Sequence, residues 1–384
     1  MTKFQFRTVP GILVEAGITD RLGPLLREQF PLTRLCLVTD RFLHESGLLA
    51  PTLASLATEG WQVKVIDHVV ADPPEHVVQE AASQAREFGA EIIVGLGGGS
   101  SMDVAKLLAV LAGSTQPLAE MYGIGNVDGG RLPLVQIPTT AGTGSEVTPI
   151  SIVTTGETTK AGVVSPVLYA DLAILDARLT LGLPPAATAA TGIDAMVHAI
   201  EAYTSKHLKN PMSDLLAEKA LKLLSANLLP ACRNGQNLAA REAMLLGAML
   251  AGQAFANAPV AAVHALAYPI GGIFHVPHGL SNSLVLPQVM RFNAPDAASL
   301  YAELADMIVD GCTGSDEAKT QALISHLEAM IEATGIERRL RDVGVQQTDL
   351  RHMAQEAMKQ TRLLGNNPRE VQEDDAYAIY AAAY

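Results

Sequence analysis

The sequence predicts a two-domain protein, in which an α/β domain over residues 1–182 precedes an all-helical domain over residues 183–384. At 384 residues the chain is too long for one comfortable hydrophobic core, so two domains are expected. The first 180 residues alternate short β-branched runs with helical patterns, which is typical of a mostly parallel, Rossmann-like sheet with helices on its faces. After GLPPAATAATG (182–192), apolar residues recur at helical spacing almost to the C-terminus.

Five apolar runs in the first half predict the strands of that sheet. Each run is rich in Val, Ile or Leu, and they cover residues 34–40, 61–67, 90–100, 133–140 and 172–176. Segments with a helical pattern, such as HVVQEAASQAREFG and SMDVAKLLAVLAG, lie between the strands. In the second half the helical pattern is clearest in LLAEKALKLLSANLL, REAMLLGAMLAGQAFA and QALISHLEAMIEAT.

Composition and charge exclude several classes of protein. Hydrophobic residues make up 48% of the chain and charged residues 17%, as expected for a globular protein with a large interior. The net charge of −13, without a basic patch, argues against nucleic-acid partners. The N-terminus lacks the apolar run of a signal peptide, and no apolar stretch has the length of a membrane span. Three widely spaced cysteines fit a reducing compartment, so we expect a soluble, cytoplasmic protein.

A glycine loop follows the third predicted strand. Gly97, Gly98, Gly99 and Ser100 stand between that strand and a predicted helix. Glycines there let backbone amides approach a pyrophosphate, and the N-terminus of the helix adds favourable partial charge. The G-x-G-x-x-G fingerprint that starts at Gly95 fails at Ser100. A tight strand-to-helix turn without a ligand explains the loop equally well.

Two further features lie at predicted strand ends. The segment 138–146, PTTAGTGSE, offers many small hydrogen-bonding groups to a phosphate, a ribose or an amide ring edge. Asp40 ends the first predicted strand, at the carboxyl edge where α/β proteins bind ligands. A carboxylate there would accept a hydrogen bond from a ribose 2′-hydroxyl and repel a 2′-phosphate, which favours NAD. Asp40 could equally cap the next helix.

The helical half carries a candidate metal site. Asp194 and His198 have i,i+4 spacing and so share one face of a helix, and His264 and His278 follow in apolar surroundings. Three imidazoles and a carboxylate can hold a divalent metal and leave a position open for substrate. Iron(II) and zinc both accept this ligand set.

Each of these residues also has an ordinary structural explanation. Thr191 could cap a helix with Asp194 at its third position, and His198 could pack beside Asp194. His264 could be a buried histidine with its hydrogen bonds satisfied, and His278 could start a helix after a proline. All four lie in apolar helical context, where unpaired polar groups are costly, and this favours a common role. The further candidate ligands are His207, His275 and His352.

Together these motifs resemble the iron-containing (group III) alcohol dehydrogenases, whose fold is shared with glycerol dehydrogenase and dehydroquinate synthase. The resemblance covers essentially the whole chain, and its blocks stand in order and at the right separations. They are GGGSSMDVAK (97–106), PTTAGTGSEVT (138–148), Lys160, LAILDARLT (172–180), GIDAMVHAIEAY (192–203), VHALAYPIGG with VPHG (263–279) and NNPREV (366–371).

The resemblance implies a role for each matching residue. The metal ligands would be Asp194, His198, His264 and His278, and the metal would be iron(II). The dinucleotide would be NAD, in keeping with Asp40. Its remaining contacts would come from Gly97, Gly98, Gly99, Ser100, Asp103, Thr139, Thr140, Thr143 and Lys160. The family is also commonly dimeric, so a homo-oligomer is expected.

One departure from the family pattern affects the proton path. Many members carry a histidine four residues after the third metal ligand, near the nicotinamide, and Tyr268 stands there in this sequence. Tyr268 or His275 could take over proton transfer, or the proton could leave through ribose hydroxyls and water.

The implied activity is that of a metal-dependent, NAD-linked alcohol dehydrogenase or aldehyde reductase. The residues expected to line the pocket between the domains are apolar or weakly polar, which favours a small, uncharged substrate; they are Phe255, Tyr268, Phe274 and Leu364. A glycerol dehydrogenase or maleylacetate reductase type of oxidoreductase is an alternative. A lyase like dehydroquinate synthase would need a dense basic group near the metal, which the helical half lacks. A non-catalytic NAD-binding assembly protein would not need complete ligand and cofactor motifs.

Overall fold

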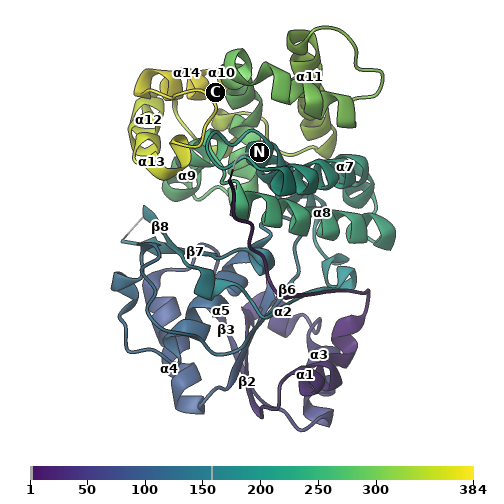
Figure 1. Ribbon diagram of the computed structural model, residues 1–384, viewed down its shortest axis with the longest axis vertical. Coiled ribbons are helices and arrows are strands. Elements are labelled where there is room, and N and C mark those ends of the chain that lie inside the picture. The colour runs from purple at the N-terminus through teal and green to yellow at the C-terminus, as the bar shows by residue number, and fades with distance from the viewer. Residues whose placement is uncertain (1–2, 157–158) are drawn as a thin grey trace. The chain divides into compact units, whose positions relative to one another are not determined.

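The computed structural model describes residues 3–156 and 159–384, and the chain divides into two compact units (Figure 1). The sheet unit contains Thr8–Thr140 and Gly144–Leu181. The helical unit contains Gly182–Tyr384, an N-terminal segment that ends at Arg7, and the short segment Ala141–Thr143. The threonine-rich loop (residues 138–146) is therefore divided between the units, whereas the sequence predicts one boundary near residue 182.

Six parallel strands form the main sheet, in the order β1-β9-β6-β4-β2-β3. All five predicted strands are present, which confirms the predicted fold class. Only β1, at the sheet edge beside β9, was not expected. The strands are β1 (Gly11–Val14), β2 (Arg34–Asp40), β3 (Gln62–Val69), β4 (Ile92–Gly97), β6 (Leu134–Pro138) and β9 (Leu172–Leu175).

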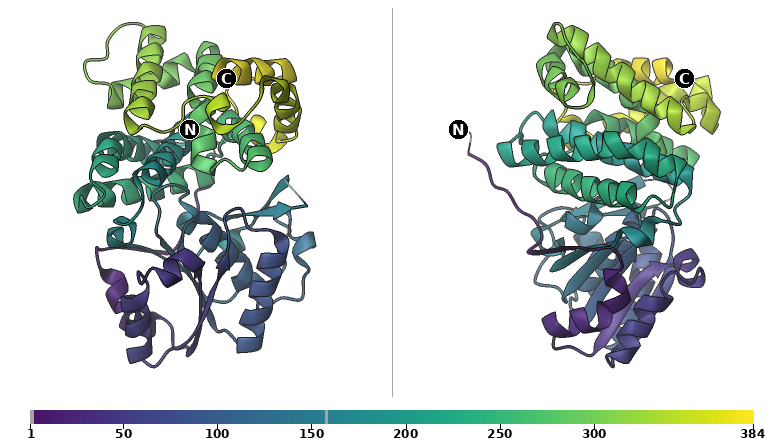
Figure 2. Two further views of the ribbon diagram at one scale, coloured as in Figure 1. Left: turned by 180° about the vertical axis from the view of Figure 1, so that it is seen from behind. Right: turned by 90° about the vertical axis from the view of Figure 1, so that its right-hand side faces the viewer.

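Helices cover both faces of this sheet, as a parallel sheet requires (Figures 1 and 2). Side chains alternate along a strand, so Leu35 and Leu37 of β2 share one face, where they join Leu22 and Leu26 in a single buried core cluster. The helices α4 and α5 pack beside each other on the opposite face. The helices of this unit are α1 (Leu22–Gln29), α2 (Arg41–Glu45), α3 (Ala50–Thr58), α4 (Glu75–Phe88) and α5 (Gly99–Leu111).

The carboxyl ends of β2, β4 and β6 bring Asp40, the glycine loop and the start of segment 138–146 to one edge of the sheet. These adjacent strands end at Asp40, Gly97 and Pro138, and Gly97 is paired in register with Pro138. The chain leaves β2 toward β3 on one side and returns to β4 on the other. This reversal of direction is the place where open α/β sheets bind ligands.

A second, small sheet was not expected from the sequence. It has the order β5-β8-β7, and β7 and β8 run antiparallel. Its strands are β5 (Gly123–Ile124), β7 (Ile150–Thr155) and β8 (Thr159–Val164).

The helical unit confirms the helical pattern of the second half. Pro185 occupies the first position of α6, where proline's fixed φ suits a helix start. The helices α6, α9 and α10 contact one another and carry the candidate metal ligands. The helices of this unit are α6 (Pro185–Tyr203), α7 (Pro211–Arg233), α8 (Leu238–Asn257), α9 (Ala262–Phe274), α10 (His278–Ile308), α11 (Asp316–Thr334), α12 (Leu350–Met358), α13 (Thr361–Leu364) and α14 (Glu373–Ala383).

Among the residues that the structure describes, no single helix is both long enough and apolar enough for a membrane span. The helices α8 and α9, bent by 108° at their junction, meet that test only as a pair.

Candidate metal centre and cofactor loops

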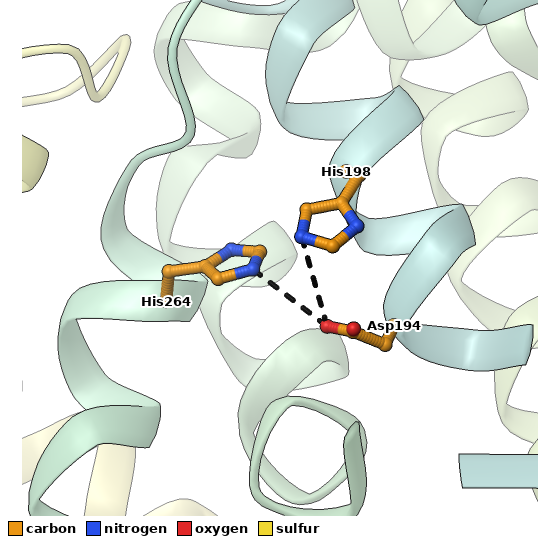
Figure 3. A group of neighbouring side chains, drawn as sticks. All are labelled: Asp194, His198 and His264. Atoms are coloured by element: carbon orange, nitrogen blue, oxygen red, sulfur yellow. Dashed lines mark ion pairs between the residues drawn. The ribbon is translucent and has the colours of Figure 1, made fainter. Parts of the chain in front are cut away.

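The four predicted metal ligands lie together in the helical unit. Asp194 and His198 project from α6, His264 comes from α9, and His278 is the first residue of α10. The Nε2 atoms of His198, His264 and His278 lie 3.9, 3.7 and 3.6 Å from one atom, Oδ1 of Asp194. Figure 3 shows His198 and His264 directed at that oxygen from two different helices.

The spacing and chemistry of these atoms fit a divalent metal. Ligand atoms about 2.1 Å from a tetrahedral ion lie about 3.4 Å from one another, close to the separations observed. Asp194, His198 and His264 are almost completely buried and form a group of potential ligands within 4.8 Å. His278 has 31% of its side chain exposed, so it is the most accessible of the four residues.

Burial keeps the His198 imidazole neutral, which is the form that binds a metal. Burial lowers the pKa of His198 to about 3, and the ring stacks on Phe255 with a centroid separation of 4.3 Å. Burial alone would raise the pKa of Asp194. The neighbouring His198, His278 and His264 outweigh burial and lower that pKa, so the carboxylate is ionised.

Two buried residues that the sequence analysis missed contact the ligands. The Nδ2 atom of Asn282 donates to Oδ1 of Asp194 at 2.6 Å and lies 3.3 Å from Nε2 of both His264 and His278. Oε2 of Glu201 lies 2.6 Å from Nδ1 of His264. Periodicity could have identified both, because Glu201 lies seven residues after Asp194 and Asn282 four residues after His278.

The structure tests two of the ordinary explanations that the sequence left open. The explanation of Thr191 as a helix cap is wrong, because α6 begins at Pro185 and the Thr191 hydroxyl donates to the Ala187 carbonyl within the helix. The explanation of His278 as a helix start is correct, and it is compatible with a ligand role.

Tyr268 and His275, the candidates for proton transfer, lie at different places on α9. The Tyr268 ring is half-buried, and its centroid is 6.1 Å from that of His278. His275 is exposed at the C-terminal end of the helix, in a left-handed conformation with φ of 56°. The other two candidate ligands, His207 and His352, are exposed.

The glycine loop lies at the start of α5. Gly97 ends β4, Gly98 is the N-cap residue, and Gly99 begins the helix, followed by Ser100. A Cβ atom added at Gly98 would meet nothing closer than the Thr140 side chain at 3.8 Å. Since Gly98 has a φ of −74°, its backbone does not require glycine either. The open space beside this residue fits the close approach of a ligand.

Asp103 lies behind this loop in a network of polar groups. Its Oδ1 accepts from the Ser145 hydroxyl at 2.6 Å, and its Oδ2 accepts from the backbone N–H of Ile152 at 2.9 Å. The buried Lys106 ammonium donates to the Ser145 hydroxyl at 2.6 Å and the Ile150 carbonyl at 2.6 Å. These contacts tie α5 to β7 and to the segment after the threonine loop, so Asp103 supports the loops.

The other predicted cofactor residues also have protein partners. Oδ1 of Asp40 accepts from the Leu43 backbone N–H at 2.9 Å, so Asp40 caps α2 as the alternative explanation proposed. Lys160 lies on β8 and forms an ion pair with Asp72 at 2.5 Å. Thr139 and Thr140 belong to the sheet unit, whereas Thr143 belongs to the helical unit.

Comparison with known families gives one result over both halves of the chain. A family model described as "Iron-containing alcohol dehydrogenase" matches residues 10–177. A second, "Fe-containing alcohol dehydrogenase family, C-terminal", matches residues 188–384.

Relatives match over nearly their full lengths. Long-chain-alcohol dehydrogenase 1 of Geobacillus thermodenitrificans is 40% identical over 96% of this chain and 93% of its own. The 1,3-propanediol dehydrogenase of Klebsiella pneumoniae is 37% identical over 91% of this chain and 90% of its own.

Solved structures agree with this match. A 1,3-propanediol oxidoreductase, 34% identical, superposes over both complete chains with a TM-score of 0.96. Sulfoacetaldehyde reductase from Bifidobacterium kashiwanohense in complex with NAD⁺, 28% identical, covers 100% of this chain and 99% of its own with a TM-score of 0.90. The chain therefore belongs to the iron-containing alcohol dehydrogenase family and is an NAD-linked alcohol dehydrogenase or aldehyde reductase.

Proposed function

We propose that Asp194, His198, His264 and His278 hold the iron, and that the glycine and threonine loops hold NAD for the oxidation of a small, uncharged alcohol or the reverse reduction. The observation that carries this proposal is the convergence of three imidazole nitrogens on one carboxylate oxygen. A bound divalent metal supplies Lewis acidity to the substrate oxygen, while NAD accepts or supplies the hydride.

The protein's part is to set the charge and the access of the site. Three neutral imidazoles and one carboxylate contribute a single negative charge, which leaves a divalent site net positive. Phe255, stacked on His198, keeps water from the buried side. His278 is the most exposed member of the set, so we place substrate entry on its side.

We assign the proton path to Tyr268 and His275. Tyr268 is the nearer candidate, because its ring lies beside His278. A phenol there can relay the alcohol proton by donating its own proton onward as it accepts one. His275, at the exposed end of α9, stands between the buried helix and solvent.

We assign the NAD contacts to Gly97, Gly98, Gly99 and Ser100 at the start of α5, with Asp40, Thr139, Thr140, Thr143 and Lys160 as further contacts. The open space beside Gly98 supports this assignment. We place Asp103 behind the loop, where its hydrogen bonds position Ser145 and β7. We further propose that the enzyme is a cytoplasmic homodimer.

The test is removal of one ligand. We expect His264→Ala to abolish metal retention after dialysis and to abolish turnover, while NADH binding remains near that of the unaltered protein. Metal analysis, a coupled assay over a panel of alcohols and aldehydes, and NADH fluorescence measure the three quantities. Full activity in this variant would refute the metal assignment, and best turnover of carboxylated substrates would refute the substrate class.

A further inference from the structure

The carboxylate of Glu201 lies behind the candidate metal centre and has two donors. Glu201 is buried on α6, one turn beyond His198. Its Oε2 lies 2.6 Å from Nδ1 of His264, and its Oε1 accepts from the backbone N–H of Val263 at 2.7 Å. Val263 is the second residue of α9, so its N–H has no partner within the helix and needs one from outside it.

We propose that Glu201 is a positioning residue that fixes the tautomer of His264, an inference that rests on the proposed metal site. Oε1 of Glu201 accepts the Val263 N–H, and Oε2 is the acceptor that faces His264 at 2.6 Å, so this contact assigns the proton to Nδ1 of His264. The lone pair of this imidazole is then on Nε2, the atom that lies 3.7 Å from Oδ1 of Asp194. Glu201 thereby presents His264 to a metal in its binding form.

The two donors explain why the residue is a carboxylate. Two N–H groups meet the same side chain, and each takes one of its oxygens. A glutamine has one acceptor and one donor group in the same space. If the glutamine oxygen kept the Val263 N–H, its NH₂ group would face Nδ1 of His264. The proton would then move to Nε2 and block the position that the metal needs.

The chain offers a matched control in Glu303, an acid on α10 that contacts the last residue of α6. Oε2 of Glu303 accepts from the hydroxyl of Tyr203, the last residue of α6, at 2.5 Å. Only one donor is involved, so a glutamine oxygen can replace that acceptor. Glu303→Gln removes one negative charge from the same unit without removing a contact to any proposed ligand.

The experiment compares Glu201→Gln and Glu303→Gln with the unaltered protein, each stripped of metal and titrated with zinc and with anaerobic iron(II) against a chromophoric chelator. We expect Glu201→Gln to weaken metal binding by about 10- to 100-fold, which is the usual effect of losing such a partner. Glu303→Gln should bind like the unaltered protein. Unchanged metal affinity in Glu201→Gln, whatever its thermal stability, would overturn the inference.

A second measurement reads the tautomer without a metal. Nitrogen-15 spectra of the histidine-labelled, metal-free protein, with His264→Asn to identify the signals, should show a protonated Nδ1 and an unprotonated Nε2. A protonated Nε2 in the unaltered protein would overturn the inference even if Glu201→Gln failed to fold. By contrast, an unaltered protein with the expected tautomer and no metal affinity would refute the proposed metal site itself.

Discussion

Among single residues, Glu146 stands out because it is a buried acid at the end of the threonine-rich segment 138–146. It is 2% exposed, and burial raises its pKa to about 7, although its backbone contact and the nearby Lys106 act in the opposite direction. In the unfolded chain a glutamate has a pKa of 4.5. Between these two values the folded protein holds a proton that the unfolded chain releases, so stability falls as pH rises.

Glu146→Gln should remove this pH dependence. In the unaltered protein this group should lower the free energy of unfolding by about 2 kcal/mol between pH 5.5 and pH 8, because each pKa unit corresponds to about 1.4 kcal/mol. Urea unfolding at the two pH values measures the difference. Glu120→Gln, at an exposed position, should keep the behaviour of the unaltered protein. An equal fall in stability for Glu146→Gln would contradict the prediction.

For single residues, the sequence identifies site residues best where a polar side chain stands in an apolar stretch. Asp194, His198, His264 and His278 are such residues, and the structure brings them together. Glu201 and Asn282 escaped prediction because a glutamate or asparagine in a helix usually faces water. Spacing places them on the same helix faces as Asp194 and His278, but the partners that they contact on other helices do not follow from spacing. For Asp103 the family resemblance implies a cofactor contact, and the structure adds hydrogen bonds from Ser145 and Ile152 to its two oxygens, which sequence spacing does not predict.

Between elements, the metal centre depends on close contact of two helix backbones. A Cβ atom at Gly279, next to His278 on α10, would lie 2.3 Å from the carbonyl oxygen of Ala190 on α6. A Cβ atom at Gly192 would meet only the ends of Leu228 and Met244 at 2.5 and 2.6 Å, which are flexible side chains. The clash at Gly279 joins an atom fixed to the α10 backbone with the α6 backbone, so it can be relieved only if one of the two helices moves.

Gly279→Ala should therefore destabilise the metal-free protein by about 1–3 kcal/mol and weaken metal binding, because α10 carries His278 away from Asp194. Gly192→Ala should cost less, since side-chain rotation and better helix propensity offset the crowding. Denaturant unfolding and metal titration of both variants measure this. If Gly279→Ala were as stable as Gly192→Ala, the close contact of α6 and α10 at this glycine would not be needed for stability.

The glycine loop gives the opposite kind of prediction. Gly98→Ala should leave the thermal stability unchanged, because the added methyl group meets no atom within 3.5 Å. NADH binding should weaken about tenfold or more, since that methyl group would occupy the space proposed for the pyrophosphate. Gly113→Ala, just after α5, adds a methyl group in open space and should change neither property. Unchanged NADH affinity in Gly98→Ala would remove the loop from the proposed site.

The sequence predicts a strand correctly where the strand is one continuous apolar run. The buried strands β2, β4 and β6 are continuous apolar runs, because both of their faces are covered by helices. The strands β7 and β8 are only partly buried, and the threonine and glycine residues along them are also common in loops. Their pairing was therefore missed.

In the whole molecule, the two kinds of proposed ligand belong to different units. All four proposed metal ligands lie in the helical unit, and the glycine loop and Asp40 lie in the sheet unit. Metal added to the stripped protein should therefore slow amide hydrogen exchange in α6, α9 and α10, and NADH should slow it around 97–106. At a hundredfold excess over the dissociation constant, the stabilisation is about 2.7 kcal/mol, or about 100-fold in exchange rate.

Mass spectrometry of peptides after hydrogen exchange measures these effects separately. The stripped protein with NADH alone serves as the control for the metal arm, because α6, α9 and α10 should then keep their exchange rates. Equal slowing of exchange in β2 and β4 on addition of metal would show that the units do not respond independently.

The proposed ligands also have a consequence for the topology of the chain. His198 and His264 are 66 residues apart, and the whole α7–α8 pair lies between them. A metal held by both would close that segment into a loop. In the entropy model for covalent bridges, a cross-link of this span raises the free energy of the unfolded chain by about 4 kcal/mol, because it removes conformational entropy. The bridge would still allow either helix to open locally, but it would restrict the chain once the whole unit had unfolded. Bound metal should accordingly slow those proteolytic cuts in α7 and α8 that require global unfolding.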